Sequence, residues 1–173
     1  FEPWTPDTPK LYDFEVLCGE DRVQSYFAMR KFSVEKDEKG VMRLFLNNKE
    51  CFHNGLLDQG YWPDGLYTAP TDEALIYDIE LSKAMGFNML RKHIKVEPEV
   101  FYYECDRAGM LVFQDMVNSG PYSFLLDTAL PTVGWRRGIR HPASKRRRTA
   151  FLQDSKGTQA LLYNHPSVVA YTI

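Results

Sequence analysis

Residues 86–93 read GFNMLRKH and residues 109–115 read GMLVFQD, and the two stretches share one pattern. In each, a glycine comes first, a short apolar run follows, and polar residues end it. A glycine in this place commonly ends a helix, and a near-continuous apolar run is typical of a strand that is buried on both faces. The two stretches therefore predict neighbouring strands of a parallel sheet, each preceded by a helix.

The rest of the second part of the chain continues this alternation. One helix is expected between a cap at Thr71 and Gly86, and another between Pro98 and Gly109. Further elements are a strand over 51–58, a helix over 148–163 and a strand over 167–173. The order predicts an α/β fold of parallel βαβ units, either a small doubly wound sheet or the first half, strands 1–4, of a (β/α)8 barrel. No glycine-rich phosphate loop follows the first strand, which disfavours a nucleotide-binding doubly wound fold.

Residues 1–35 have the chemistry of β-strands instead. Two or three strands are expected over 11–17, 24–30 and 31–34, and a further short hairpin over 41–48. Because two or three strands cannot close a core alone, this part is expected to be the end of a β-sandwich whose earlier strands lie upstream. We expect the domains to be residues 1–35 and 36–173, with the boundary in the region of residues 35–50.

The composition is that of a globular protein. The 173 residues are 44% hydrophobic and 25% charged, with a net charge of −2, which excludes a largely disordered chain and an overall field that attracts nucleic acid. No apolar run reaches the ~18–20 residues of a membrane span, and no signal peptide opens the chain, so a cytoplasmic location is favoured. Both ends look cut from a longer polypeptide.

Buried free thiols are expected at Cys18, Cys51 and Cys105. The basic residues within 136–148 are interpreted as a solvated helix start rather than a nucleic-acid site.

Polar residues gather where the predicted parallel strands end, and in a barrel that end is the active-site rim. Trp62 follows the first strand, and a flat apolar ring with a polar tip matches the face of a sugar. Asp58, Arg91 and Asp115 follow successive strands and are expected to converge on one pocket. The candidate substrate-binding residues are Asp58, Gln59, Trp62, Arg91, His93, Gln114 and Asp115. The alternatives are strand ends that are polar only because they meet water, and a Trp62 that packs under its own loop.

The segment 116–143 is too long for an ordinary connection between a strand and a helix. It contains Tyr122, Phe124 and Trp135, so a lid or a wall over the same rim is expected. A disordered loop is the alternative.

Six segments resemble parts of glycoside hydrolase family 2. WTPDTPKLY at 4–12 and YFAMRK at 26–31 are similar to segments of its immunoglobulin-like sandwich domain. Three further segments are similar to its barrel strands 1, 2 and 3: DQGYWPDG at 58–65, GFNMLRKH at 86–93 and VFQDM at 112–116. NHPSVV at 164–169 is similar to the lead-in to strand 4. The resemblance covers nearly the whole chain apart from residues 117–147, and it lies in the order and spacing of the motifs.

This resemblance implies both a fold and a function. The fold is a partial (β/α)8 TIM barrel (strands 1–4) preceded by the last strands of an immunoglobulin-like β-sandwich. The function is part of a retaining β-glycosidase, which uses two glutamates ~5–5.5 Å apart. In the family, the acid/base follows an Asn at the end of strand 4 and the nucleophile ends strand 7. Both are therefore expected beyond Ile173, and the chain alone is expected to be inactive. No cofactor and no metal is implied. The expected partners are a β-glycoside and either the rest of its own polypeptide or a second copy in a homo-oligomer.

Two site residues carry roles implied by the resemblance. Arg91 matches the family's strand-2 arginine, which orders the acid site, and Asp115 stands where the family often has an acid. Asp58-Gln59 replaces the Arg-His of galactosidases, and His93 stands one residue closer to the arginine than the family histidine, so the sugar is not specified. A non-catalytic carbohydrate-binding or assembly fragment, and a complete small α/β domain of unrelated function, are the alternatives.

If the reading frame continues, we expect Asn-Glu within a few residues of Ile173. The motif at residues 164–167 leads into a strand that must end at the rim, where the family places its acid/base. Sequencing the gene beyond the codon for Ile173 tests this. A stop codon, or a continuation without Asn-Glu, would contradict the glycosidase interpretation.

Overall fold

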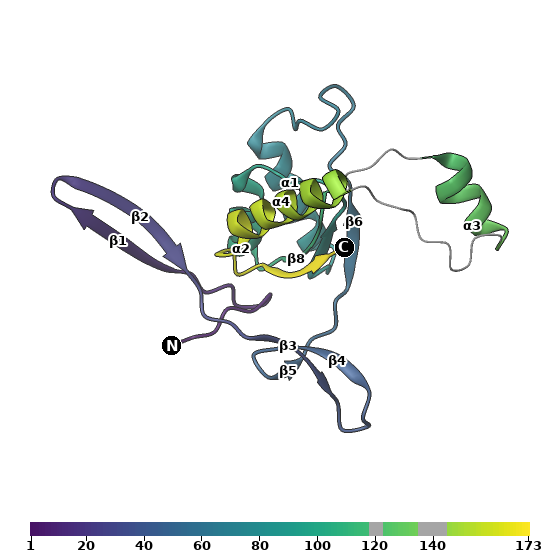
Figure 1. Ribbon diagram of the computed structural model, residues 1–173. Helices are drawn as coiled ribbons and strands as arrows, with labels where there is room; N and C mark the ends of the chain where they lie inside the picture. The colour runs from purple at the N-terminus through teal and green to yellow at the C-terminus, as the bar shows by residue number, and fades with distance from the viewer. Residues whose placement is uncertain (118–122, 135–144) are drawn as a thin grey trace.

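A four-stranded parallel sheet forms the centre of the chain. The computed structural model describes residues 1–117, 123–134 and 145–173 (Figure 1). The strands pair in chain order: β6 (Gly55–Asp58), β7 (Met89–Lys92), β8 (Leu111–Asp115) and β9 (Val168–Thr172). Each neighbouring pair is parallel, which confirms the predicted βαβ pattern. β6 is shorter than the expected strand 51–58, because Cys51 N–H donates to Leu44 O and so extends an antiparallel hairpin instead.

Helices connect these strands, and local sequence signals mark several of their ends. The helices are α1 (Asp72–Ala84), α2 (Glu99–Ala108) and α4 (Lys145–Leu162). Thr71 Oγ1 accepts the N–H of Ala74 at the start of α1, and Gly109 ends α2 in the left-handed conformation with φ 72°. Pro98 caps α2 rather than occupying its first turn, and α4 begins at Lys145 rather than at residue 148.

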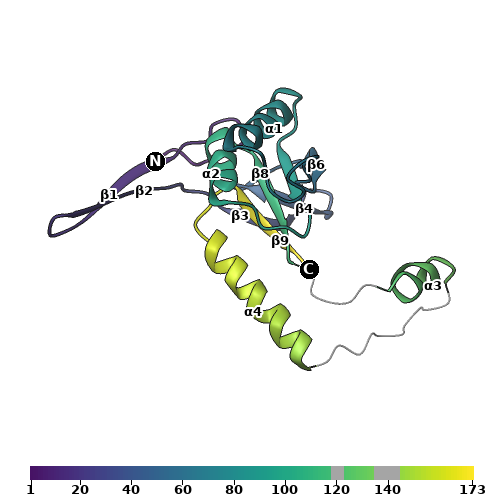
Figure 2. The same cartoon turned by 90° about the horizontal axis from the view of Figure 1, so that it is seen from above.

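The three helices contribute to one core on one face of the sheet. Its buried residues are Leu75 and Ile79 from α1, Phe101, Tyr102 and Cys105 from α2, Leu162 from α4, and Leu90, Met110, Val112 and Val168 from the strands and their approaches. Figure 2 shows that the C-terminal end of α4 is the part of this helix nearest to the sheet. The buried residues of the helix, Thr158 and Leu162, lie in this end. A doubly wound sheet carries helices on both faces. The described helices do not follow that arrangement. This disfavours the doubly wound sheet relative to the alternative, in which strand order follows chain order.

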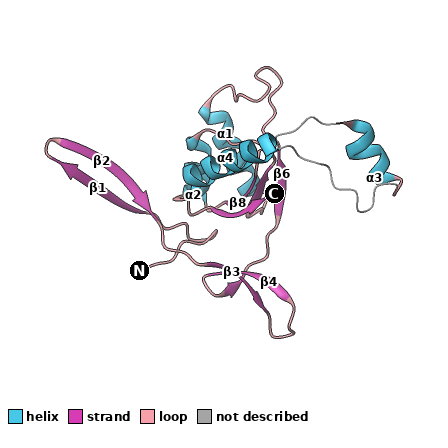
Figure 3. Cartoon of the chain, in the orientation of Figure 1, coloured by secondary structure: helices cyan, strands magenta, loops and turns pink. Residues whose placement is uncertain are grey.

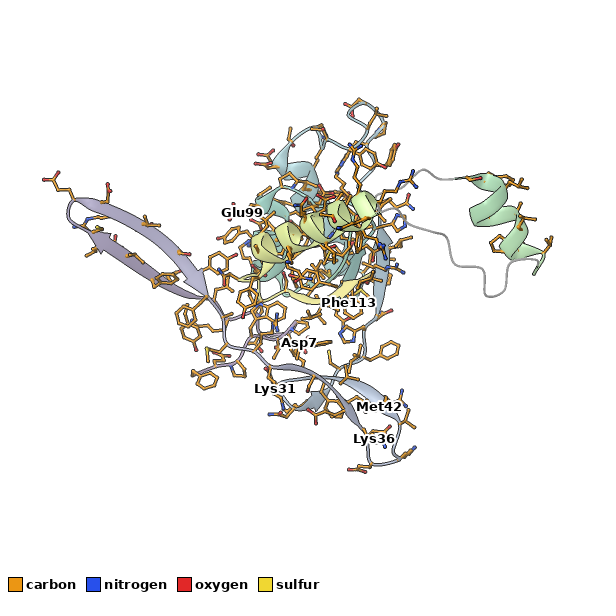
Figure 4. All side chains as sticks on the ribbon, viewed as in Figure 1. Asp7, Lys31, Lys36, Met42, Glu99 and Phe113 are labelled. Carbon is orange, nitrogen blue, oxygen red and sulfur yellow. The ribbon has the colours of Figure 1, made fainter. Side chains whose placement is uncertain are left out.

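Residues 12–50 form two antiparallel sheets (Figure 3). The first pairs β1 (Tyr12–Cys18) with β2 (Asp21–Phe27), and the second contains β3 (Phe32–Lys36), β4 (Met42–Leu46) and β5 (Lys49–Glu50). Asn47 and Asn48 join β4 to β5 with φ 53° and 65°, the left-handed pair that a tight hairpin turn requires. Lys36 and Met42, the register pair nearest the other turn, are labelled in Figure 4.

The expected strand stretches 24–30 and 31–34 are separate strands, β2 and β3, and they lie in different sheets. Between them, the Arg30 guanidinium donates to the carbonyls of Pro166 and Val168 at 2.8 and 2.7 Å. This long-range contact directs the chain toward β9 and ends the hairpin of β1 and β2. β3 also crosses the expected boundary between residues 35 and 36, and the division into two domains stays a prediction.

The three cysteines differ in exposure. Cys105 is buried as expected and Cys51 is half-buried, and burial raises the pKa of both thiols. The expectation is wrong for Cys18, which is exposed. It stands beside the turn of the β1–β2 hairpin, which projects from the rest of the described chain (Figure 1).

A buried carboxylate connects the N-terminal segment to the parallel sheet. Asp106 of α2 is fully buried, and its Oδ2 accepts a hydrogen bond from the Tyr26 hydroxyl at 2.7 Å. The same oxygen lies 2.7 Å from His165 Nδ1, and Oδ1 accepts the backbone N–H of Ser167 at 2.8 Å. The indole of Trp4 donates to the Asp106 carbonyl at 2.8 Å. Burial and the nearby carboxylate raise the pKa of the Tyr26 hydroxyl far above its usual value, so it remains a donor.

Asp106→Asn is expected to lower the free energy of unfolding by about 3 kcal/mol. The amide nitrogen of asparagine cannot accept the hydrogen bonds that the carboxylate oxygen accepts, so a buried donor loses its partner. Urea denaturation followed by circular dichroism measures the loss. Glu80→Gln is the control: its side chain is 60% exposed and 3.5 Å from Arg107, and an exposed pair of this kind contributes under about 1 kcal/mol. Equal midpoints for the two variants would contradict the role given to Asp106.

Candidate functional site

The sheet register divides the predicted site residues between the two faces of the sheet. Arg91 is aligned with Phe113. Asp58, Lys92 and Gln114 form the next row. Side chains alternate along a strand, so the two rows point to opposite faces. The register therefore places Asp58 on the face opposite to Arg91, and substrate binding by these residues stays a prediction.

Arg91 and Asp115 form an ion pair on the face away from the helices. Arg91 Nε donates to Asp115 Oδ1 at 2.9 Å, and Nη2 donates to Oδ2 at 3.1 Å. The Asp115 side chain is 6% exposed, whereas that of Arg91 is 46% exposed. The hydrogen bonds from the guanidinium to Asp115 raise the pKa of Arg91 above its usual value, so the group stays charged. A bidentate pair has a defined orientation, and it presents an oriented cation at the carboxyl ends of β7 and β8.

Four charged side chains gather on the helix-facing side. The Lys92 ammonium is fully buried, lies 3.0 Å from Asp58 Oδ2, contacts Glu97 Oε1, and lies 4.9 Å from the centre of the Phe101 ring of α2. Lys95 Nζ lies 2.9 Å from the same Glu97 oxygen. We refer to Asp58, Lys92, Lys95 and Glu97 as the charge cluster. Its two cations and two anions balance in charge, and their attraction offsets part of the free-energy cost of removing charged groups from water.

The charge cluster surrounds the loop that follows β6. Asp58 Oδ1 accepts the N–H of Gly60 at 2.9 Å, and Lys95 donates to the Gly60 carbonyl at 3.1 Å. Gly60 has φ 61°, a left-handed conformation, and a β-carbon at this position would collide with the ends of the buried Lys92 and Glu97 side chains. Glycine satisfies both requirements, since it adopts this conformation freely and has no β-carbon.

Gln59 and Trp62 lie in the same loop. Together with Asp58 and Asp78 they line a groove of about 610 Å³ between β6 and α1. Burial and the neighbouring Asp58 raise the pKa of Asp78. The Trp62 ring packs against the main core, as the alternative for this residue predicts. Arg91, His93, Gln114 and Asp115 are not among the described residues that line the groove.

Gln114 is buried, and its side chain is bonded within the fold. Its Oε1 accepts the Tyr102 hydroxyl at 2.6 Å, and its amide donates to the carbonyls of Lys95 and Asp115 at 2.8 and 2.9 Å. Burial raises the pKa of the Tyr102 hydroxyl well above its usual value. Gln114 thus cross-links β8, α2 and the loop after β7, and this placement gives no support to the predicted contact with substrate.

His93 is half-buried directly after β7, and its N–H donates to Asp58 O at 2.9 Å. The next residue, Ile94, has φ 48°, which a β-branched residue rarely adopts. The chain leaves the sheet at this strained residue and passes through Lys95 and Glu97 before α2 begins. The geometry therefore keeps His93 at the carboxyl edge of the sheet.

The sequence prediction missed Lys92, Lys95 and Glu97. A signal was present, because a lysine inside an apolar strand needs a buried partner, and Glu97 occurs in the loop that follows. The sequence alone did not show that Lys92 turns toward the helices.

The structure describes part of the segment that was expected to form a lid. It contains the π-helical turn η1 (Phe124–Ala129) and the short helix α3 (Leu130–Thr132), and Phe124 is exposed. Tyr122 and Trp135 lie outside the described residues, and the lid stays a prediction. The basic residues 145–148 are exposed in the first turn of α4, as a solvated helix start predicts.

Solved structures share this fold over nearly the whole chain. A β-glucuronidase from an uncultured Clostridium sp. aligns with a TM-score of 0.78 and 18% identity, over 99% of this chain and 27% of that one. A GH2 β-galacturonidase from Eisenbergiella tayi, bound to galacturonate, aligns with a TM-score of 0.71 and 20% identity, over 98% and 27%. A Bacteroides uniformis β-glucuronidase aligns with a TM-score of 0.71 and 25% identity, over 98% and 18%. The fold is that of a segment of glycoside hydrolase family 2. The resemblance seen in the motifs is thus confirmed for the fold, and the chain spans at most 27% of the length of these three proteins.

No protein-family model and no curated protein matches the sequence. None of the described helices is long and apolar enough to cross a membrane. Within the described ranges, no three His, Cys, Asp or Glu side chains are grouped as a metal site requires. The cytoplasmic location stays a prediction.

Gly60→Ala is expected to lower the free energy of unfolding by about 3 kcal/mol, combining the cost of a left-handed alanine with a collision against the charge cluster. Gly19→Ala is a matched control, because Gly19 has φ 60° and open space around its missing β-carbon. The control is expected to lose only about 1 kcal/mol. Urea denaturation of both variants measures the difference, and equal losses would contradict the crowding described at Gly60.

Proposed function

We propose that this chain is part of a retaining β-glycosidase of glycoside hydrolase family 2. In this proposal, residues 1–35 end an immunoglobulin-like β-sandwich, and residues 36–173 form the first four strands of a (β/α)8 barrel. A parallel sheet whose strand order follows the chain, with its helices on one face, supports the barrel assignment. The shared fold of β-glucuronidases and a β-galacturonidase supports the reaction class.

The Arg91–Asp115 pair is the observation that carries the proposal. It lies at the carboxyl ends of two adjacent strands, on the face away from the helices, where a barrel has its active site. Asp115 fixes the guanidinium through two hydrogen bonds, and the partly exposed side of Arg91 can bind a further carboxylate. In the proposed mechanism this carboxylate is the acid/base glutamate, which a neighbouring cation helps to orient.

The proposed reaction proceeds with retention through two glutamates that the polypeptide supplies beyond Ile173. One protonates the leaving oxygen, and the other attacks the anomeric carbon. The solved neighbours are named for glucuronides and galacturonides, so we propose a β-uronide as the first substrate to test.

Aryl β-glucuronides, β-galacturonides and β-galactosides are the substrates for the test. The longer polypeptide that contains this chain is expected to hydrolyse at least one of them, and NMR of the first-formed sugar is expected to show retention. The 173-residue chain alone is expected to give no turnover above background. Failure of the longer polypeptide on every glycoside, or turnover by the purified chain, would contradict the proposal.

Arg91→Gln in the longer polypeptide is expected to lower kcat/KM by about 100-fold or more, the loss typical when an oriented polar group is removed from an active site. Arg43→Gln is the matched control, because Arg43 is 47% exposed and pairs with Asp37 at 3.2 Å far from the rim. The control is expected to retain wild-type kinetics. Equal kinetics for the two variants would contradict the role of Arg91.

A further inference from the structure

We propose that Lys92 is a positioning residue: its buried ammonium ties the loop after β6 to the loop after β7 and holds both in place at the rim. This inference rests on the proposed function and deepens it. Asp58, on one side of Lys92, precedes the first loop, and Glu97, on the other side, ends the second. No part of the Lys92 side chain reaches the surface, so it acts through these neighbours and does not itself touch substrate.

Both loops contain a left-handed residue that needs support. The first turns at Gly60, with φ 61°, and the second at Ile94, with φ 48°. A β-branched residue in this conformation is strained, and such strain persists only where the surroundings impose it. Lys95 supplies part of this constraint, since it lies 2.9 Å from Glu97 and donates to Gly60 O at 3.1 Å. Lys92 supplies the rest of the constraint, because its ammonium contacts both Asp58 and Glu97.

The loops held in this way contain three of the predicted substrate-binding residues. Gln59 and Trp62 flank the Gly60 turn, and His93 directly precedes Ile94. The N–H of His93 also donates to Asp58 O, so the same acid that binds Lys92 is connected to both loops. Loss of Lys92 is therefore expected to loosen the two loops that contain Gln59, Trp62 and His93, while the Arg91–Asp115 pair on the opposite face keeps its own contacts.

A half-buried lysine, Lys83, provides a control. Lys83 Nζ donates to the carbonyls of Pro6 and Gly109 at 2.7 and 2.9 Å, and Gly109 lies before the start of β8, at the amino end of the sheet. Lys83→Met removes a comparable cross-link without touching the rim loops. The double variant Lys92→Met/Glu97→Gln removes one charge of each sign, so it restores the balance of the charge cluster but not the connection between the loops.

The experiment measures hydrogen exchange and steady-state kinetics in the longer polypeptide. In Lys92→Met, amide exchange in residues 59–68 and 93–97 is expected to rise about tenfold or more, with exchange in α2 and β8 unchanged. KM for the glycoside is expected to rise more than kcat falls. Lys83→Met is expected to change neither readout, and the double variant is expected to recover stability without recovering the exchange pattern or KM.

Several outcomes would overturn the positioning role. These are a uniform rise in exchange across the chain, equal kinetic losses for Lys92→Met and Lys83→Met, or recovery of KM in the double variant. If Lys92→Met does not fold, Asp58→Asn is measured in the same way, and unchanged exchange at residues 59–68 overturns the role. Exchange does not depend on catalysis, so an inactive polypeptide contradicts the proposed function while the exchange data still decide the role of Lys92.

Discussion

The carboxylate of Asp106 lies out of reach of water, and the arrangement of the described chain depends on the donors that compensate it. Tyr26 comes from the β1–β2 hairpin, and His165 and Ser167 come from the approach to β9. A buried charge without such partners would be strongly destabilising, so these segments must meet at α2 for the fold to be stable. The consequence is that an antiparallel hairpin, a helix and the fourth strand of the parallel sheet are connected around one residue.

Partly buried polar contacts of two cations reinforce this connection. Arg30 donates to the carbonyls on either side of Ser167, and Lys83 bridges the N-terminal segment to the end of α2. Each supplies a charged donor to two backbone carbonyls, which makes the hydrogen bonds stronger than those between neutral groups. The β-rich N-terminal residues are thereby attached to the parallel sheet at several points rather than through a linker alone.

The alternation of side chains along β7 separates two ionic systems. Arg91 points away from the helices and pairs with Asp115, whereas Lys92 points toward them and enters the charge cluster. One system presents a partly exposed cation, and the other is almost sealed. In the proposed family 2 active site, the first provides an oriented charge at the rim, and the second provides the rigidity of the loops beside it.

Local signals in the sequence determined the elements of the second half of the chain. Thr71, Gly86 and Gly109 mark helix ends because capping and left-handed φ values depend on a residue and its near neighbours. Apolar runs identified β7 and β8 and their parallel pairing, because a strand covered on both faces has no polar alternation. The polar strand ends were correctly placed at one edge of the sheet. The order and spacing of the motifs also identified the family whose fold the chain shares.

Only the tertiary structure decided which of those polar residues meet. Whether Asp58 lies beside Arg91 or beside Lys92 depends on register between strands, and a shift of one residue reverses every side chain. The interruption between β2 and β3 depends on carbonyls near residue 166, and the burial of Gln114 depends on Tyr102 and the loop after β7. These contacts join residues far apart in the sequence, and no local preference of the chain encodes which of its many polar groups becomes the partner of another.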